Sequence, residues 1–385
     1  MTQKLNVALV GLGFGSCFAE IYQNHPDIET LTLCDANPQR LEKQGRETGV
    51  TRLRHSLDEV LADPTIDAVH LNSGIPDHAR QSVAVLNAGK HCACTVPMAT
   101  NLDDIRAIIN ARQKSGKNYM MMETQLFARE FLFACELRDQ GVFGRLQFLR
   151  GAHYQDMEHW PSYWAGLPPM WYSTHAVAPC LAFAQTRATR VRCLGSGYMR
   201  DELKAQYDNP FPIETALFEL ESMENNAPLC MEITRALFHS ARGYSESFHI
   251  YGENATLEAA QLEGSEAPVL FRLSPLNASP GSAPRRVGSH ERVYVPDYAD
   301  RLPQEIARFT GAKELDARGE HPSVLHGGGH GGSHPHLVHE FVRSILENRA
   351  PVCDEIHAAT YTAPGICAHQ SALQNGQPVD IPTFA

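Results

Sequence analysis

The sequence predicts an α/β protein of two domains, a doubly wound parallel sheet followed by an α+β domain with an open, mostly antiparallel sheet. Apolar runs of strand length alternate with helical patterns up to Met122, and a glycine-rich turn separates the first run from the first helical pattern. After Glu123 the strand-like runs follow one another with few helices between them. Alternation of strand and helix favours parallel strands with right-handed crossovers, whereas consecutive strands favour antiparallel pairing.

The first predicted domain spans residues 1–124 and binds a dinucleotide. Its predicted strands are Leu5–Val10, Leu31–Cys34, Ala68–Leu71, His91–Thr95 and Tyr119–Met122. Its predicted helices are Cys17–Asn24, Asp77–Leu86 and Asn101–Lys114, the last one capped by Thr100.

The second predicted domain spans residues 125–385 and serves substrate binding and oligomerisation. It begins with a helix at Glu130–Gln140, and its predicted strands are Leu146–His153, Val191–Ser196, Ala216–Leu220, Leu229–Thr234 and Phe248–Tyr251. Residues 261–325 are rich in Pro, Ser, Gly and charge, which predicts long surface loops. Pro335 suits the first turn of a helix that runs to about Glu347. We expect the C-terminal helix and tail to be able to pack back on the first domain.

Composition narrows the class of protein. The chain has 385 residues, is 43% hydrophobic and carries a formal charge of −11, which argues against binding to nucleic acid. Its ten cysteines contain no CxxC pair, so we expect reduced, buried thiols. No apolar run approaches the ~20 residues that span a bilayer, and the N-terminus enters a strand directly. We therefore expect a cytoplasmic protein with a small-molecule partner.

The stretch "GLGFGS" carries the cofactor prediction. Gly11, Gly13 and Gly15 allow a tight turn, and a helix that starts near Ser16 would aim free N–H groups at a pyrophosphate. Asp35 ends the second strand 22 residues after Gly13, where a carboxylate accepts hydrogen bonds from the ribose hydroxyls of NAD and repels a 2′-phosphate. This arrangement predicts a Rossmann domain that binds NAD in preference to NADP.

Other residues are expected to complete the cofactor site. Arg40 is the counter-evidence to NAD, because it could accommodate a phosphate, although we favour a solvated helix residue at this position. The remaining candidates come from the glycine turn, from the carboxyl ends of the later strands and from the stretch "NSGIPDHA"; they are Phe14, Asn72, Ser73, His78, Pro97 and Glu123. For Glu123 a solvent-exposed loop carboxylate is the alternative.

A nucleotide domain of this kind, followed by an open sheet, resembles the Gfo/Idh/MocA oxidoreductases over nearly the whole chain. Most of that superfamily has Glu-Lys-Pro after the fifth strand, and its lysine assists hydride transfer. The matching residues here are Thr95, Val96 and Pro97, so the lysine is absent. The resemblance therefore implies the fold and NAD, but it does not imply an ordinary dehydrogenase mechanism.

A subset of the superfamily has Val-Pro at that position, namely the NAD-dependent glycosidases of glycoside hydrolase family 109 and their relatives. Four further stretches resemble this subset: "YMMMET", "WYSTHAVAP", "GHGGSH" and "PVDIPTF". The Tyr-x-Thr-His match within the second is the most specific of them. His153 is a departure, because the galactosaminidases of the subset carry a tyrosine there.

Tyr172 and His175 are the leading candidates for proton transfer. Three positions apart, they share one face if the segment is helical, and a phenol beside an imidazole can act as an acid/base pair on a sugar. The alternative is a buried Tyr and His that merely satisfy each other. The glycosidase reaction that the resemblance implies, described below, removes protons from the C3 hydroxyl and from C2 of the sugar. We assign the C3 hydroxyl proton to His175 and the C2 proton to Tyr172 or His153.

The stretch "HGGGHGGSHPHLVHEF" contains five histidines: His326, His330, His334, His336 and His339. His336 and Glu340 would share a helical face, so the stretch can be read as a metal cluster. We favour a role for His330 in closing over the sugar, and we predict no metal. Tyr154 and Trp164 are also placed among the substrate-binding residues. Arg200, Arg235 and Arg242 are either partners of an anionic sugar substituent or surface residues.

The resemblance implies a glycosidase in which NAD is recycled within each turnover. Hydride leaves C3 of the sugar, the ketone acidifies C2–H, the aglycone is eliminated, water adds to the enone and the hydride returns. The alternative is a net sugar dehydrogenase, such as a glycoside 3-dehydrogenase. A third class, a non-catalytic NAD sensor, leaves Tyr172 and His175 unexplained. The superfamily also implies a homodimer or homotetramer.

Overall fold

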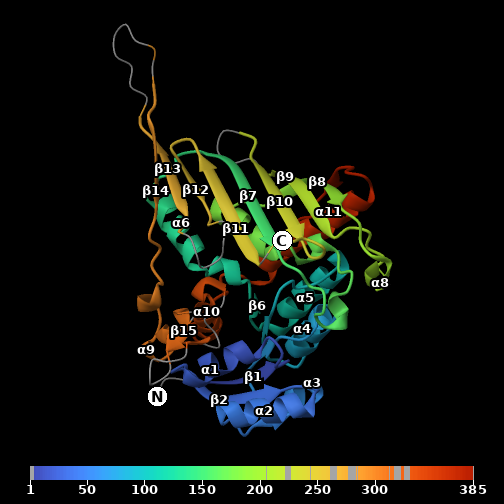
Figure 1. Ribbon diagram of the computed structural model, residues 1–385. Coiled ribbons are helices and arrows are strands. Elements are labelled where there is room, and N and C mark those ends of the chain that lie inside the picture. Colours follow the sequence, from blue (N-terminus) through green and yellow to red (C-terminus); the bar gives the residue numbers. More distant parts are fainter. Residues whose placement is uncertain are drawn as a thin grey trace. The chain divides into compact units, whose positions relative to one another are not determined.

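The computed structural model describes residues 4–204, 206–221, 227–242, 244–260, 267–275, 283, 285–311, 313–315, 322–324 and 330–384. The chain divides into two compact units (Figure 1). The first unit comprises Met1–Ala128, Asp297–Ala363 and Phe384–Ala385, and the second comprises Arg129–Pro296 and Pro364–Thr383. The sequence analysis placed all of 125–385 in the second domain, whereas here residues 297–363 return to the first unit. The roles predicted for the domains stay predictions.

The first unit contains a six-stranded sheet in the order β3-β2-β1-β4-β5-β6, and every neighbouring pair is parallel. The strands are β1 (Leu5–Val10), β2 (Ile28–Cys34), β3 (Leu53–Arg54), β4 (Ala68–Leu71), β5 (His91–Cys94) and β6 (Tyr119–Met121). The order reverses between β1 and β4, which creates the crevice where such sheets bind nucleotides. The predicted doubly wound sheet is confirmed.

The helices that join these strands are α1 (Ser16–Asn24), α2 (Pro38–Thr48), α3 (Leu57–Ala62), α4 (His78–Asn87) and α5 (Leu102–Ser115), with a 3₁₀ turn η1 at Ile75–Asp77. The predicted cap of α5 was wrong by one residue. Asn101 is the cap, because its side-chain oxygen accepts a hydrogen bond from the backbone N–H of Asp104 at 2.8 Å. The helices α2 and α3 were not predicted.

The returning segment of the first unit contains η6 (Ala299–Arg301), α9 (Gln304–Ala307), η7 (Arg308–Thr310), β15 (Lys313–Leu315), β16 (Pro322–Val324), η8 (His330–Gly332) and α10 (His334–Leu346). Helix α10, predicted from Pro335 to Glu347, packs its apolar face on α1. The buried side chains at this contact include Leu337 and Phe341 of α10 and Phe18 and Ile21 of α1. Burial of this apolar surface explains why residues 297–363 belong to the first unit.

The second unit contains a nine-stranded sheet in the order β14-β13-β12-β11-β7-β10-β9-β8-β17. Its strands are β7 (Leu146–Tyr154), β8 (Ala188–Ser196), β9 (Ile213–Leu220), β10 (Cys230–Ala236), β11 (Ser245–Gly252), β12 (Ala255–Glu258), β13 (Val269–Leu273), β14 (Gly288–Arg292) and β17 (Val379–Asp380). Only the β7/β10 pair among these neighbours is parallel. The predicted mostly antiparallel sheet is therefore confirmed.

Residues 261–325 are not wholly loop, as the sequence analysis expected. β13 and β14 form a hairpin that extends the large sheet, because Leu270 is buried against the unit and the two strands pair over five residues. α9, β15 and β16 also fall in this range. Residues 261–266, 276–282, 284, 312, 316–321 and 325–329 lie outside the described residues.

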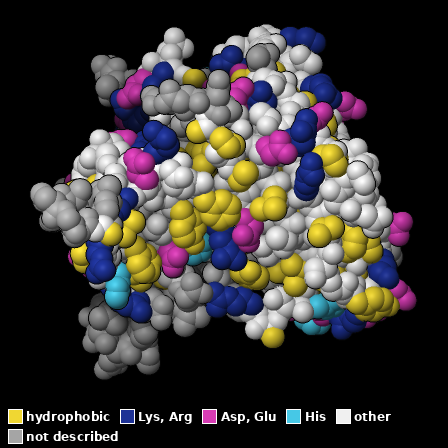
Figure 2. Space-filling model, turned by 90° about the horizontal axis from the view of Figure 1, so that it is seen from above, with side chains coloured by type: hydrophobic (Ala, Val, Ile, Leu, Met, Phe, Trp, Pro, Cys, Tyr) yellow, Lys and Arg dark blue, Asp and Glu magenta, His cyan; other side chains and the backbone are white. Residues whose placement is uncertain are grey.

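Helices cover one face of the large sheet. The helices of this unit are α6 (Arg129–Asp139), α7 (Thr174–Ala184), α8 (Asp201–Lys204) and the part of α11 (Glu355–Leu373) from Pro364 onward, together with the 3₁₀ turns η3 (Ser162–Trp164) and η4 (Pro169–Tyr172). α7 packs against β7, β10 and β11. On β9, side chains alternate between buried and exposed, so the opposite face carries exposed residues such as Leu217. Figure 2 shows a face on which hydrophobic side chains lie between charged ones. None of the described helices has the length and apolarity of a membrane span.

Candidate active site

The glycine turn of the first unit is tightly built. Gly11 has a φ of +86°, and a Cβ atom there would lie 2.5 Å from the backbone oxygen of Asn72. A Cβ atom at Gly15 would lie 2.2 Å from the oxygen of Gly11. At Gly13, in contrast, the nearest atom to an added Cβ is Nη1 of Arg40 at 3.9 Å. Two glycines therefore allow close packing, and the third leaves space above the turn.

Helix α1 begins at Ser16, as predicted, and no side chain caps its first N–H groups. Free N–H groups at a helix N-terminus bind phosphate, because the helix dipole adds to their hydrogen bonds. The tight turn and the uncapped helix together fit the pyrophosphate of a dinucleotide. Phe14 lies half-exposed on the turn, in edge contact with the rings of His330 and His334 at 6.0 and 5.8 Å. His330 therefore lies beside the glycine turn.

Asp35 is held in place by the backbone. Its Oδ2 accepts the N–H of Leu12 at 2.7 Å and its Oδ1 accepts the N–H of Asn37 at 2.7 Å. These bonds orient the carboxylate and leave acceptor capacity on Oδ1 for a ribose hydroxyl. Arg40 is not a simple solvated residue, because its Nη1 lies 3.2 Å from Oδ2 of Asp35. Arg40 therefore belongs to this end of the predicted site.

The carboxyl ends of β4 and β5 bring the next group of predicted residues together. Asn72 lies under the glycine turn, and the Ser73 hydroxyl donates to the side chain of Gln81. His78 is buried, with Nδ1 2.7 Å from the Pro97 oxygen and Nε2 3.0 Å from the Ser73 oxygen. His78 thus connects the loops after β4 and β5 and does not face solvent, which suits a positioning role.

Glu123 is buried rather than exposed on a loop. It caps η2 (Thr124–Leu126), because its Oε1 accepts the N–H of Gln125 at 3.0 Å. The solvent-exposed alternative is therefore wrong, and a contact of Glu123 with the cofactor or sugar stays a prediction.

A second constellation is formed within the second unit. Three neighbouring strands place Glu246 of β11, His153 of β7 and Arg235 of β10 opposite one another, since Glu246 pairs with His153 and His153 pairs with Arg235. Opposite residues on adjacent strands point to the same face. This row brings a carboxylate, an imidazole and a guanidinium together on the sheet.

Tyr172 and His175 complete this constellation. Tyr172 ends η4 and His175 lies in the first turn of α7, so the two do not share one helix, yet the Tyr172 hydroxyl lies 3.4 Å from Nε2 of His175. Oε1 of Glu246 lies 3.7 Å from Nε2 of His175 and 3.7 Å from Nε2 of His153. The predicted Tyr and His residues are therefore brought together, and a buried carboxylate lies within reach of both imidazoles.

Glu246 was missed by the sequence analysis. Its side chain is 4% exposed and also accepts a hydrogen bond from the Tyr244 hydroxyl. It precedes the strand predicted at Phe248–Tyr251 by two residues, and no local pattern distinguishes it from an exposed strand carboxylate. Only the pairing of β11 with β7 reveals its place.

Buried hydrogen bonds hold the turn that carries Tyr172. The backbone N–H of Met170 donates to Oε2 of the buried Glu214 at 2.8 Å, and Oε1 of Glu214 lies 2.7 Å from Nδ1 of His369. The Ser173 hydroxyl donates to the Met170 oxygen at 2.8 Å. These contacts hold η4 and the start of α7 in one geometry.

The other candidates of the second unit lie at several places. Trp164 contacts the Tyr172 ring edge-on at 4.8 Å, so it belongs to the constellation. Tyr154 lies at the end of β7 with the Arg242 guanidinium 5.9 Å from its ring. Arg200 pairs with Glu158, and Arg235 is completely buried, which excludes a surface role for Arg235.

The predicted histidine stretch is split between several contacts. His339 shares a hydrogen bond of 3.0 Å with His25, and His334 packs on Phe18. Within the described ranges, no three His, Cys, Asp or Glu side chains are placed to hold a metal ion. His326 lies outside the described residues.

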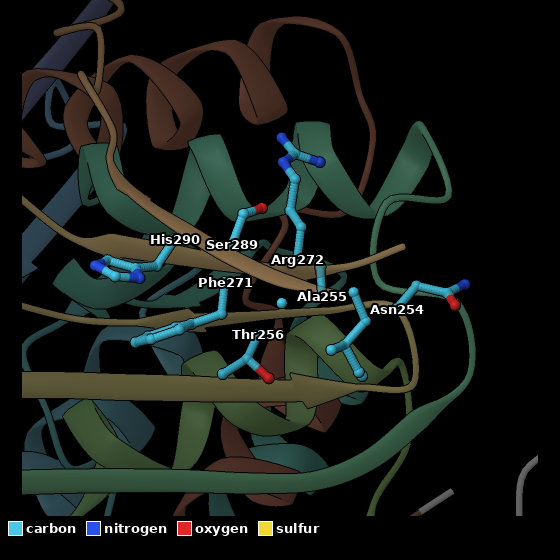
Figure 3. A pocket seen from close by; sticks show the side chains of 10 residues that line it. Asn254, Ala255, Thr256, Phe271, Arg272, Ser289 and His290 are labelled. Atoms are coloured by element: carbon cyan, nitrogen blue, oxygen red, sulfur yellow. The ribbon is translucent and has the colours of Figure 1, made fainter. Parts of the chain in front are cut away.

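A separate pocket of about 240 Å³ lies at the edge of the large sheet (Figure 3). Its labelled side chains come from β12, β13, β14 and the turn before β12: Asn254, Ala255, Thr256, Phe271, Arg272, Ser289 and His290. None of the predicted site residues lines it. Its exposed position and its lack of any buried acid or base make it a surface hollow and not a candidate for catalysis.

The N-terminal part of the chain matches a known family, and longer alignments relate the chain to curated proteins. Residues 5–123 match the Gfo/Idh/MocA model, described as an oxidoreductase family with an NAD-binding Rossmann fold. Glycosyl hydrolase family 109 protein 1 of Bacteroides thetaiotaomicron is 24% identical over 422 aligned residues, which cover 99% of this chain and 85% of that protein. The protein of the same name from Bacteroides fragilis strain YCH46 is 29% identical over 177 residues, 42% of this chain and 38% of that protein.

Solved structures share the fold over the whole chain. A levoglucosan dehydrogenase in complex with NADH and levoglucosan superposes with a TM-score of 0.73 at 19% identity, covering 99% of this chain and 100% of that chain. At this identity the likeness concerns the fold alone.

Proposed function

Because residues 5–123 match the Gfo/Idh/MocA oxidoreductase family with its NAD-binding Rossmann fold, we propose that this chain is an NAD-dependent glycoside hydrolase. The proposed reaction oxidises a sugar transiently at C3, eliminates the aglycone from C1, adds water and restores the C3–H bond. The substrate class is a glycoside, in keeping with the names of the family 109 relatives.

One observation carries this proposal. The end of β5 offers Thr95, Val96 and Pro97, none of which transfers protons near neutral pH, whereas the second unit holds Tyr172, His175, His153 and Glu246 as one connected group. A reaction with several proton transfers needs several such groups. Oxidation followed by elimination requires proton acceptors for both O3 and C2, and simple hydride transfer requires only the first.

The residues of the first unit would hold the nucleotide. The glycine turn and α1 would bind the pyrophosphate, and Asp35 would bind the adenosine ribose, with NAD preferred over NADP. When bound, NAD⁺ supplies a hydride acceptor for C3 and later the hydride donor. Asn72, Ser73, His78 and Pro97 would shape the crevice at the sheet's switch point.

The residues of the second unit would move the protons. His175 takes the proton from the C3 hydroxyl, and the Glu246 carboxylate 3.7 Å away stabilises the resulting imidazolium. Tyr172 or His153 takes the C2 proton as the C1–oxygen bond breaks, and the aglycone leaves with that bond's electron pair. The same group exchanges this proton with solvent and returns a proton to C2 after water adds to C1. Trp164 and Tyr154 would present aromatic faces to the ring.

The decisive experiment uses a panel of aryl glycosides in deuterium oxide. We expect release of the aglycone without accumulation of NADH, and a sugar product that carries deuterium at C2. Net oxidation, the second candidate, would give stoichiometric NADH with an intact glycosidic bond. Hydrolysis without C2 deuterium would contradict the elimination step.

His175→Ala tests the acid/base assignment. We expect a loss of ~10²–10⁴ in kcat, since a positioned proton-transfer group contributes about that much, with NAD affinity unchanged. His55→Ala, at an exposed histidine of the first unit, is the matched control. An unchanged kcat for His175→Ala would remove His175 from the mechanism.

We also propose a homodimer or homotetramer in the cytoplasm. The exposed face of the large sheet supports this, because it carries large apolar side chains on several strands, among them Leu194, Leu217 and Phe271. A sheet of this kind with one covered face commonly buries its other face against a further layer.

A further inference from the structure

Arg235 is a buried cation at the centre of the second constellation. Its side chain is 0% exposed. Nε donates to the backbone carbonyl oxygen of Tyr172 at 2.8 Å, Nη1 donates to the backbone carbonyl oxygens of His153 and Ala236, and Nη2 donates to Oε1 of Gln155 at 2.9 Å. All of these acceptors are neutral. Over the described parts of the chain, no carboxylate forms an ion pair with this guanidinium.

A buried charge that meets only neutral acceptors creates a strong local potential. Hydrogen bonds satisfy the donors, but the net positive charge is not cancelled, and burial in a medium of low dielectric extends its effect on neighbours. Burial lowers the pKa of Arg235 to about 10, while Tyr172, Tyr244 and Glu246 act in the opposite direction. Arg235 is therefore a cation at neutral pH, and an anion close to it is stabilised.

The Tyr172 ring is the aromatic group that this cation faces. The guanidinium carbon lies 5.2 Å from the ring centroid, and Nε fixes the backbone of the same residue. The ring of His153 on β7 lies 6.0 Å from the Tyr172 ring, centroid to centroid. Nε2 of His175 on α7 lies 3.4 Å from the Tyr172 hydroxyl. Glu246 on β11 reaches both imidazoles. The negative charge of Glu246 opposes ionisation of the Tyr172 phenol, whereas the positive charge of Arg235 favours this ionisation.

We propose that Arg235 is the positioning residue of this site, whose buried cation holds Tyr172 in place and stabilises negative charge on its hydroxyl oxygen. The catalytic role of Tyr172 in this proposal rests on the proposed function. In the elimination step the Tyr172 phenolate accepts the C2 proton, and the C–H electron pair passes into the enolate of the C3 ketone. The aglycone then leaves with the C1–oxygen electron pair. Arg235 itself touches no reacting atom.

Tyrosine labelled with ¹³C at Cζ allows the Tyr172 hydroxyl to be titrated by NMR, with Tyr172→Phe identifying its signal. In the wild-type protein we expect a pKa below the ordinary tyrosine value of about 10. Arg235→Met removes the charge and keeps a long apolar side chain, so the pKa should rise by about 1 to 2, the effect of a nearby opposite charge. Arg235→Lys keeps the charge and should leave the pKa within about 0.5 of wild type.

The outcomes separate this inference from the proposed function. An unchanged Tyr172 titration in Arg235→Met overturns the inference, whether or not the protein cleaves glycosides. If Arg235→Met does not fold, the wild-type titration decides, and a pKa above about 10 overturns it. The expected titrations without any glycosidase activity would support the electrostatic role of Arg235 and contradict the proposed function.

Kinetics supply a second measurement. On an active glycoside, Arg235→Met should move the acidic limb of the pH profile of kcat to higher pH, because Tyr172 acts as a base only when it is ionised. Arg235→Lys should move this limb far less. KM should change by less than about threefold in both variants, because the side chain is buried away from solvent. A rise in KM with kcat preserved would show that Arg235 acts in substrate binding, and would overturn the role proposed for it.

Discussion

His78 gives the sharpest test of how the first unit is held together. Both of its ring nitrogens lie within hydrogen-bond distance of backbone carbonyl oxygens, those of Pro97 and Ser73. A neutral imidazole has one N–H and can donate to only one of them, whereas an imidazolium donates to both. Burial opposes the charge, but Cys94 and the two carbonyls outweigh it and raise the pKa of His78 to about 9.

This pKa sets the size and the pH range of the effect. Against an unfolded value of about 6.5, a folded value of about 9 corresponds to roughly 3 kcal/mol of stability. The folded protein binds the proton more tightly than the unfolded chain does. The stabilisation is therefore complete below about pH 6.5 and is lost as the pH rises through about 9.

Urea unfolding of the wild type and His78→Gln, at about pH 6 and about pH 10, measures this. Glutamine can still donate to one carbonyl, so its packing penalty is common to both pH values. The variant should lose roughly 3 kcal/mol more, relative to wild type, at the lower pH than at the higher one. His55→Gln, at an exposed position, should show no such difference.

A direct measurement covers the case in which His78→Gln does not fold. The ¹⁵N chemical shifts of the His78 ring in the wild-type protein should be those of an imidazolium at neutral pH. A neutral ring there, or an equal loss of stability at both pH values, would refute the reasoning from the two carbonyls.

Three further outcomes are expected. In calorimetry NAD should bind more tightly than NADP. Asp35→Ala should narrow this difference in affinity because it leaves Arg40 beside the ribose site, whereas Arg40→Ala should not narrow it. Equal affinities for NAD and NADP in the wild type would contradict the preference for NAD. Gly365→Ala should destabilise the fold by about 1–3 kcal/mol, because its Cβ would lie 2.0 Å from the Met170 oxygen, whereas Gly288→Ala, with only a contact at 3.8 Å, should be tolerated. Light scattering should give the mass of a dimer or tetramer of the 42.6 kDa chain, and a monomer mass at micromolar concentration would contradict the proposed self-association.

Local sequence was sufficient for the first unit. The glycine turn, the helix start at Ser16 and Asp35 are close together along the chain, so their relation follows from one strand, one turn and one helix. The strand and helix periods also predicted most of the parallel sheet. Arg40 shows the limit of this reasoning, because the sequence offered only a phosphate ligand or a solvated side chain, and the structure contains a pair with Asp35 that neither reading included.

The second constellation depended on tertiary structure. Tyr172 and His175 could be found from their spacing and from a family motif, but Glu246 and Arg235 lie far from them in sequence and reach them through the pairing of β11, β7 and β10. The sequence by itself thus determined the fold class and the nucleotide turn, which arise from short-range periodicity and backbone freedom. Strand register alone decided which acid, base and cation share one buried space, because a shift of one residue would turn each of these side chains to the opposite face.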